Sequence, residues 1–155
     1  MKILGPDSLV FGVDDVAACR RFLEDYGLDP VGATEAGGRF EALDGTSVVL
    51  ARRDDPGLPT PLETATMLRK TVYGVADAET LEAVARELGK DRDVVRLADG
   101  SLEAKDDLGF LLGFQVTVRR PLELPAEAVN APGAPAGRGP NALGIVEDAA
   151  VKPRT

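Results

Sequence analysis

The pattern of apolar and polar positions near the start of the chain predicts a strand followed by an amphipathic helix. Residues 9–13 form a short apolar run that fits a strand. Asp14 or Asp15 then supplies a helix cap, and Gly27 supplies a stop signal after the last apolar position. Between them the apolar residues recur at helical spacing, on a face that we expect to be buried. They are Val16, Cys19, Phe22, Leu23 and Tyr26.

Three short strands are predicted after this helix. Gly37-Gly38 and Asp44-Gly45 favour the positive φ angles of tight hairpin turns, and they separate stretches of strand-like composition. The predicted strands cover residues 29–34, 39–43 and 46–52. The first part of the chain therefore reads as a β-α-β-β-β unit.

The same pattern returns 62 residues later. A strand over 68–75 leads to Asp77, which caps a second helix that Gly89 ends. The apolar face of this helix consists of Leu81, Val84, Ala85 and Leu88. Three strands follow, over residues 93–97, 101–105 and 110–119. One unit cannot bury its apolar face alone, so we expect an α+β fold in which two βαβββ units share a core.

Individual positions also match at this offset. Val10-Phe11-Gly12-Val13-Asp14-Asp15 recurs as Val72-Tyr73-Gly74-Val75-Ala76-Asp77, and Tyr26-Gly27 recurs as Leu88-Gly89. The other matched pairs are Gly38 with Gly100, Phe40-Glu41-Ala42 with Leu102-Glu103-Ala104, and Asp44 with Asp106. The repeat divides a domain over residues 1–120 into units at about 5–53 and 67–120, joined by a Pro-rich connector.

The composition changes after Pro121. Residues 121–155 are rich in Pro, Gly and Ala and show no apolar period, so they read as a linker or tail. We expect this segment to lead to a second domain beyond it. If the segment is ordered, it should pack on the domain or on a neighbouring copy and bury its few large apolar residues. These are Leu122, Leu124, Val129, Leu143 and Ile145.

Charge and composition exclude several classes of function. The net charge of −8 argues against nucleic acid and anionic membranes as partners. A single cysteine and the lack of a long apolar segment fit a cytoplasmic protein. The chain contains no histidine, which removes Ser–His and Cys–His catalysis and the commonest metal ligand.

The duplicated entry into each helix, Val13-Asp14-Asp15 and Val75-Ala76-Asp77, resembles the vicinal oxygen chelate superfamily. The Asp107-Leu108-Gly109 turn before the last strand adds to the resemblance, which covers about residues 5–120. This superfamily includes glyoxalases, bleomycin resistance proteins and extradiol dioxygenases. The resemblance implies a curved, cup-shaped mixed sheet with the helices outside. The tail makes the chain most similar to the metal-free N-terminal domain of a two-domain extradiol dioxygenase.

The metal-ligand positions that the resemblance implies are not occupied by suitable residues. Members of the superfamily hold a divalent metal with side chains from the first and last strands of each unit. Counting from the repeat landmarks, these positions hold Ser8, Val49, Lys70 and Gly113. We therefore expect no metal, cofactor or catalytic residue in this chain. Glu41 and Glu103, at matching repeat positions, could be imagined as magnesium ligands, but solvated strand carboxylates are the better interpretation.

Strand alternation assigns a set of small and apolar residues to the inside of the cup. They are Ser8, Val10, Gly12, Ser47, Val49, Ala51, Lys70, Val72, Gly74, Leu111, Gly113 and Gln115. Five of these form a possible pocket lining: Ser8, Val49, Lys70, Gly113 and Gln115. Lys70 and Gln115 are its polar groups, and either the cup is filled by neighbouring segments or Lys70 holds a carboxylate or phenolate there.

Two functions remain open. The first is a non-catalytic domain of a larger protein that cleaves an aromatic diol in aromatic catabolism, with iron or manganese held in another domain. The second is a metal-free binding module of the bleomycin-resistance type, with a small aromatic or acidic ligand. The scarcity of aromatic residues, with no tryptophan and two tyrosines, counts against the second. A second domain or a second copy of the chain is the expected partner.

Overall fold

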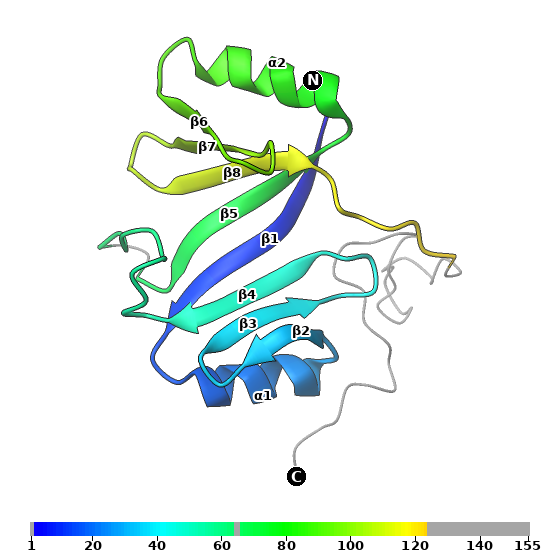
Figure 1. The fold of residues 1–155 in the computed structure, drawn as a ribbon, viewed down its shortest axis with the longest axis vertical. Helices are drawn as coiled ribbons and strands as arrows, with labels where there is room; N and C mark the ends of the chain where they lie inside the picture. The colour runs from blue at the N-terminus through cyan, green and yellow to red at the C-terminus, as the bar shows by residue number, and fades with distance from the viewer. Residues whose placement is uncertain (1, 64–65, 124–155) are drawn as a thin grey trace, which may run out of the picture.

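The structure, a computed structural model, describes residues 2–63 and 66–123 (Figure 1). Within them lie eight strands and two helices. The first unit contains β1 (Ile3–Val13), α1 (Val16–Tyr26), β2 (Asp29–Thr34), β3 (Gly37–Glu41) and β4 (Ser47–Arg52). The second contains β5 (Leu68–Val75), α2 (Ala78–Leu88), β6 (Val94–Arg96), β7 (Leu102–Lys105) and β8 (Leu111–Val116). The predicted α+β arrangement of two βαβββ units is confirmed.

All eight strands of the described residues join one mixed sheet in the order β2-β3-β4-β1-β5-β8-β7-β6. The units meet where β1 pairs antiparallel with β5, and Leu9 pairs there with Thr71. Since Thr71 follows Leu9 by the 62 residues of the sequence repeat, a pseudo-two-fold axis passes between these two residues. The units therefore join edge to edge, with one helix over each half (Figure 1).

Each helix covers its own apolar cluster on one face of the sheet. The first cluster contains Val13, Val16, Leu28, Phe40, Ala42 and Leu50. The second contains Val75, Leu81, Val84, Leu102 and Phe114. Both helices begin at the predicted caps, where Asp15 accepts a hydrogen bond from Ala18 N at 2.8 Å and Asp77 from Thr80 N at 2.7 Å. The two units are thus stabilised by separate but equivalent cores, and the expectation that they share one core is wrong.

The apolar face predicted for α1 is only partly correct. Val16 is buried, and Cys19 and Leu23 pack against the first cluster. Phe22 is 64% exposed and Tyr26 is 45% exposed, and their rings stack on one another at 6.4 Å between centroids. Helical spacing shows which residues share a broad stripe, but the tilt of the helix on the sheet decides which side of that stripe is buried. In α1 the buried side lies along Val16 and Leu23.

The repeat offset changes from 62 to 64 residues after the helices. β1 pairs with β4 through Ser8 and Ser47, whereas β5 pairs with β8 through Lys70 and Leu111. Leu111 therefore corresponds to Ser47, 64 residues earlier. The extra two residues fall between Gly89 and β6, where the chain makes a turn before the strand begins.

This change corrects several matches expected at the shorter offset. Glu103 pairs with Gly113 in the sheet, and Arg39 pairs with Val49, the counterpart of Gly113. Glu103 is therefore equivalent to Arg39 and not to Glu41. For the same reason Gly38 corresponds to Leu102 instead of Gly100, and the Phe40-Glu41-Ala42 and Asp44 matches shift by two residues.

The first strand, the last strand and the β2–β3 turn differ slightly from the prediction. Gly37 and Gly38, which the sequence predicts as a turn, begin β3, because the turn falls on Glu35 and Ala36. β1 begins at Ile3, six residues earlier than the apolar run suggested, and β8 ends at Val116 instead of residue 119. Residues 117–120 leave the sheet because they bond to the first unit: Arg120 N donates to Asp44 O at 2.7 Å, and Val118 N donates to the Asp7 carboxylate at 3.1 Å. We call residues 117–120 the strap.

The predictions for the tail lie outside the described residues, apart from half-buried Leu122. In the described part of the chain, neither helix is long or apolar enough to cross a membrane.

Candidate functional site

The candidate site is the helix-free face of the sheet, which consists of the strand residues that alternate with those under the helices. Phe11 and Val13 in β1 and Tyr73 and Val75 in β5 belong to the helix-covered clusters. Their neighbours in the strands therefore project from the opposite face. This places Ser8, Val49, Lys70, Gly113 and Gln115 on the helix-free face, where the sequence assigned them.

The most specific feature of this face is an ion pair between Lys70 and Glu103. Lys70 lies on β5 and Glu103 on β7, so the lysine side chain must cross β8 to reach its partner. It crosses at Gly113, where an added Cβ would lie 2.9 Å from Lys70 Cε. The two side chains are only 18% and 22% exposed. The missing side chain of Gly113 thus makes room for a largely buried ion pair.

The equivalent place in the first unit carries neutral groups. Ser47 Oγ donates to Ser8 Oγ at 3.0 Å, and both serines are buried. Val49, the counterpart of Gly113, fills the space next to Val10, its partner in β1. Beyond it, Arg39 pairs with Glu41 at 2.8 Å within β3. The two halves of the face therefore differ in chemistry although their strands have the same arrangement.

A buried carboxylate that the sequence analysis did not single out holds one end of this face together. Asp7 is 1% exposed and sits at a β-bulge, where the pairing of β1 with β5 shifts between Pro6 and Ser8. Its oxygens accept from Thr117 Oγ1 at 3.0 Å, Val118 N at 3.1 Å and Gln115 Nε2 at 3.2 Å. Arg119 Nε lies 3.2 Å from Asp7 Oδ1, as an ion pair without good hydrogen-bond geometry.

This network gives Gln115 a structural role. The sequence places Gln115 in the possible pocket lining as a polar group, but its amide donates to Asp7. Asp7 could not be found from local patterns because its partners lie 108 to 111 residues away in the chain.

Arg69 occupies the equivalent bulge in β5, where the pairing with β1 shifts between Val10 and Phe11. Arg69 is 5% exposed, and its guanidinium donates to three carbonyl oxygens of the connector. The acceptors are Thr66 O at 2.8 Å, Pro59 O at 2.9 Å and Arg53 O at 3.1 Å. Asp7 and Arg69 therefore anchor the strap and the connector, the two segments that follow the last strand of each unit.

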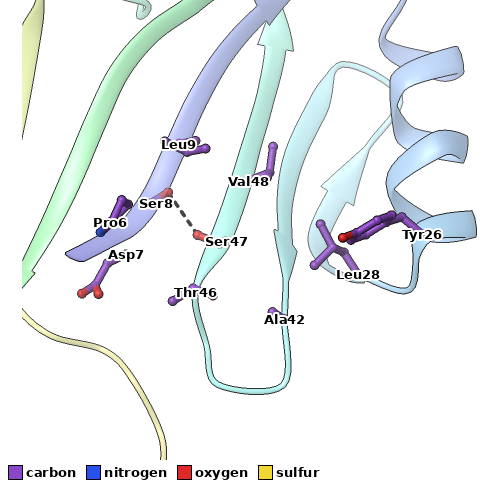
Figure 2. A pocket seen from close by; sticks show the side chains of 10 residues that line it. All are labelled: Pro6, Asp7, Ser8, Leu9, Tyr26, Leu28, Ala42, Thr46, Ser47 and Val48. Atoms are coloured by element: carbon purple, nitrogen blue, oxygen red, sulfur yellow. Dashed lines mark hydrogen bonds between the residues drawn. The ribbon is translucent and has the colours of Figure 1, made fainter. Parts of the chain in front are cut away.

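Two cavities border these groups. One, of about 590 Å³, is lined by Glu103, Lys105 and Leu111 from the second unit and by Leu58–Thr60 of the connector. The other, of about 380 Å³, lies at the starts of β1 and β4 (Figure 2). Its lining is Pro6, Asp7, Ser8, Leu9, Tyr26, Leu28, Ala42, Thr46, Ser47 and Val48. We call it the α1 pocket, because Tyr26 and Leu28 at the end of α1 form one of its walls.

The residues at the implied ligand positions do not fit a divalent metal. A site with two histidines and a carboxylate needs three donors that converge on one ion. Lys70 presents an ammonium group that is held by Glu103, Gly113 and Val49 have no donor side chain, and the Ser8 hydroxyl is bonded to Ser47. In residues 2–63 and 66–123, no three His, Cys, Asp or Glu side chains come together as a metal site.

Perturbed carboxylates of the described chain lie at turns and helix caps and not on the helix-free face. Backbone and hydroxyl donors of Thr80 lower the pKa of Asp77, the α2 cap. The hydroxyl and backbone N–H of Ser101 lower the pKa of Asp99 in the turn before β7. For Asp54 and Asp91, the side chain of a neighbouring arginine lowers the pKa of the carboxyl group. The interactions that cause these shifts stabilise turns and the cap of α2, and they do not prepare a group for catalysis.

The comparisons with known proteins show the fold. Neither the protein-family models nor the curated proteins contain a match to this chain. Among solved structures, homoprotocatechuate 2,3-dioxygenase from Brevibacterium fuscum matches with a TM-score of 0.55 and 23% identity, over 75% of this chain and 33% of that one. Its anaerobic complex with 3,4-dihydroxyphenylacetate gives the same TM-score and identity, over 77% and 38%.

The corresponding enzyme from Arthrobacter globiformis matches with a TM-score of 0.55 and 21% identity, over 75% of this chain and 37% of that one. The chain thus spans little more than a third of the length of these dioxygenases. Together with the duplicated units and their sheet order, these matches show that the chain has the fold of these extradiol dioxygenases, the vicinal oxygen chelate fold.

Proposed function

We propose that this chain is a metal-free, non-catalytic domain of a larger extradiol-dioxygenase-like protein, in which another domain holds iron or manganese and cleaves an aromatic diol. The observation that carries the proposal is the Lys70–Glu103 ion pair across Gly113. Lys70 places a positive charge at a position where the fold relatives would need a metal ligand. Glu103, the carboxylate nearest to Lys70, is already bound to it.

The likeness in fold supports the larger context. The chain covers 33–38% of the three dioxygenase chains compared above, as expected for one domain among several. The coding sequence beyond Thr155 should then encode another pair of βαβββ units, this time with histidines on its first strands. A downstream region without such units would contradict this part of the proposal.

A metal and activity assay tests the non-catalytic role directly. The 155-residue chain, purified without a histidine tag and incubated with Fe²⁺ or Mn²⁺ under anaerobic conditions, should retain well below one equivalent after desalting. It should produce no ring-cleavage product from catechol or 3,4-dihydroxyphenylacetate. One tightly held equivalent of metal, or turnover above that of the free ion, would overturn the proposal.

The second candidate, a small-molecule binding module, is favoured by the cavity of about 590 Å³ beside Glu103, which lies in the size range of ligand pockets. A carboxylate or phenolate that used Lys70 would have to displace Glu103 first, which makes this function the weaker of the two. Calorimetry with a panel of catechols and aromatic acids separates them. Micromolar binding that is lost in Lys70→Ala would establish the binding module, and no heat of binding is expected for a structural domain.

A further inference from the structure

The strap fills one place on the first unit with a positive charge. The Arg120 guanidinium lies at the β3–β4 turn, where its Nη2 is 3.3 Å from Glu41 Oε2. A Cβ on Gly45 would lie 3.3 Å from Arg120 Cζ, so the guanidinium packs directly on this glycine. Arg39 binds the other oxygen of Glu41 at 2.8 Å. The Glu41 carboxylate, which is 18% exposed, is therefore covered and neutralised by two arginines.

The equivalent place on the second unit is a cavity. By the 64-residue offset of the strands, Lys105 corresponds to Glu41 and Gly109 to Gly45, and the two glycines have almost the same φ, 85° and 87°. Lys105 and Gly109 both line the cavity of about 590 Å³. A Cβ on Gly109 would find its nearest neighbour in the described residues at 4.0 Å, so this glycine lacks the cover that Arg120 gives to Gly45.

The polar groups of the lining favour a singly charged anion. Within the described chain, no hydrogen bond or ion pair holds the Lys105 ammonium group. Arg92, the other cation among the lining residues, already binds Asp91 at 2.8 Å and Lys105 O at 3.2 Å. Asp93 also lines the cavity and would repel a doubly charged ligand such as phosphate. The cavity therefore offers one unpaired positive charge.

The rest of the lining favours an aliphatic ligand. Val95 is 54% exposed although it lies on a strand of the sheet. The connector wall is fixed in place, because the buried Arg69 guanidinium donates to Pro59 O at 2.9 Å. A pre-formed cavity with apolar walls and a few polar groups is typical of small-molecule sites. The lining offers no ring on which an aromatic ligand could stack, since its apolar residues are Leu58, Pro59, Val95, Ala104 and Leu111.

We propose that this cavity binds an aliphatic monocarboxylate, with the carboxylate on Lys105 and the alkyl chain against Val95 and the connector. The bound anion then takes the place in the second unit that the Arg120 cation takes in the first. The Lys70–Glu103 ion pair stays intact, so this site differs from a pocket built on Lys70. The proposal goes beyond the proposed function, because a domain without catalysis can still bind a small molecule.

Titration calorimetry of the 155-residue chain with octanoate tests the charged part of the site. Neutral octanamide should bind about tenfold more weakly than octanoate, because it lacks the charge that pairs with Lys105. In Lys105→Ala the dissociation constant for octanoate should rise by about tenfold, while that for octanamide stays the same. Lys90→Ala is the matched control and should bind like the parent, since Lys90 is an exposed lysine that pairs with Glu87 on α2.

A second pair of variants tests the apolar part of the site. Val95→Asp should weaken octanoate binding, and Val31→Asp, its counterpart in the first unit, should not. Val31 and Val95 are similarly exposed, at 47% and 54%, so both variants should fold. No binding by the parent, unchanged affinity in Lys105→Ala or Val95→Asp, or an equal loss in Val31→Asp would overturn the proposal. Binding that needs Lys70 but survives Lys105→Ala would also overturn it and would support the binding module instead.

Discussion

The two units share one backbone plan but use opposite charges at the same place in it. In each unit a bulged residue on the first strand lies over a glycine of the partner unit's first strand: Asp7 over Gly74 and Arg69 over Gly12. Asp7 binds donors of the strap, and Arg69 binds acceptors of the connector. The repeat therefore preserves the bulge and the space above the glycine, while the sign of the charge follows the segment that each residue anchors.

Asp7 and Arg69 hold the strap and the connector beside the helix-free face. Equivalent main-chain bonds, from Arg53 N to Val13 O and from Thr117 N to Val75 O at 2.9 Å each, lead both segments away from the sheet. Beyond these bonds, the Asp7 carboxylate binds the strap and the Arg69 guanidinium binds the connector. A carboxylate with several donors tolerates burial because every lone pair finds a partner. A guanidinium does the same when carbonyl oxygens surround it.

Removal of the anchor Asp7 should give the largest effect of all the substitutions. Asp7→Ala leaves Arg119, which is 15% exposed, without its carboxylate and also removes an acceptor for Thr117 and Val118. We expect a loss of about 3–5 kcal/mol in the free energy of unfolding. Arg69→Ala leaves three carbonyl oxygens without their donor, but water can reach these oxygens more easily than it can reach the partners of Asp7. We therefore expect a loss of about 2 kcal/mol in the free energy of unfolding. Urea unfolding followed by circular dichroism measures both.

Asp54→Ala is the control for the anchor variants, because Asp54 forms an exposed ion pair with Arg52. It should change stability by less than about 1 kcal/mol. If Asp7→Ala costs no more than Asp54→Ala, the strap is not held by the buried carboxylate. An equal loss for Asp7→Ala and Arg69→Ala would remove the distinction between the two anchors.

Alanine in place of Gly74 or Gly12 should destabilise the two units to different extents. A Cβ on Gly74 would lie 2.3 Å from Asp7 Oδ1, a fixed and fully bonded group. A Cβ on Gly12 would meet Leu58 Cδ1 at 2.8 Å and Arg69 Nη2 at 3.1 Å, and the leucine end can move. We expect about 2–3 kcal/mol of destabilisation for Gly74→Ala and about 1 kcal/mol for Gly12→Ala. In an Asp7→Ala background the cost of Gly74→Ala should shrink, since the clash is gone.

Local patterns were sufficient to predict most of the fold. The caps at Asp15 and Asp77, the Asp44-Gly45 turn and the alternation of the strands act over a few residues, so sequence alone located both units and the helix-free face. The Gly27 stop is also as predicted, with φ of 108°, but Gly89 ends α2 in right-handed geometry at φ −65° and uses no special freedom of glycine. A glycine after the last apolar position marks the end of a helix without fixing its conformation.

The rest depends on contacts between distant residues. The exposure of Phe22 and Tyr26 follows from how α1 tilts on the sheet, and the two-residue insertion before β6 shows only in the strand register. Asp7 and Arg69 become anchors because bulges turn them onto the helix-free face, and no spacing rule predicts a bulge. The sequence does not fix the role of Lys70, because its partner Glu103 is 33 residues away and lies on β7, on the far side of β8.

The Lys70–Glu103 pair should contribute less than the anchors. Lys70→Met keeps the alkyl chain over Gly113 and leaves Glu103 without a partner on a largely buried surface. We expect a loss of about 1–2 kcal/mol for Lys70→Met. In the double variant Lys70→Met/Glu103→Gln, part of that loss should return. The first-unit pair Arg39–Glu41 is the comparison, and Arg39→Met should cost less because Arg39 is 37% exposed. A double-mutant cycle without coupling between Lys70 and Glu103 would contradict the ion pair.

The smallest expected effect concerns acid and the cap of α2. Hydrogen bonds from Thr80 hold the pKa of Asp77 below its ordinary value of 3.8. Because the folded-state pKa is the lower one, the charged cap stabilises the fold at neutral pH, and this contribution disappears as the pH falls through the folded-state pKa. Asp77→Asn keeps an acceptor for Thr80 N but cannot titrate. The melting temperature of Asp77→Asn should therefore lie below that of the parent at pH 7, and the gap should narrow by pH 3. A gap that widens on acidification would mean that protonation of Asp77 stabilises the second unit, which the geometry of the cap does not allow.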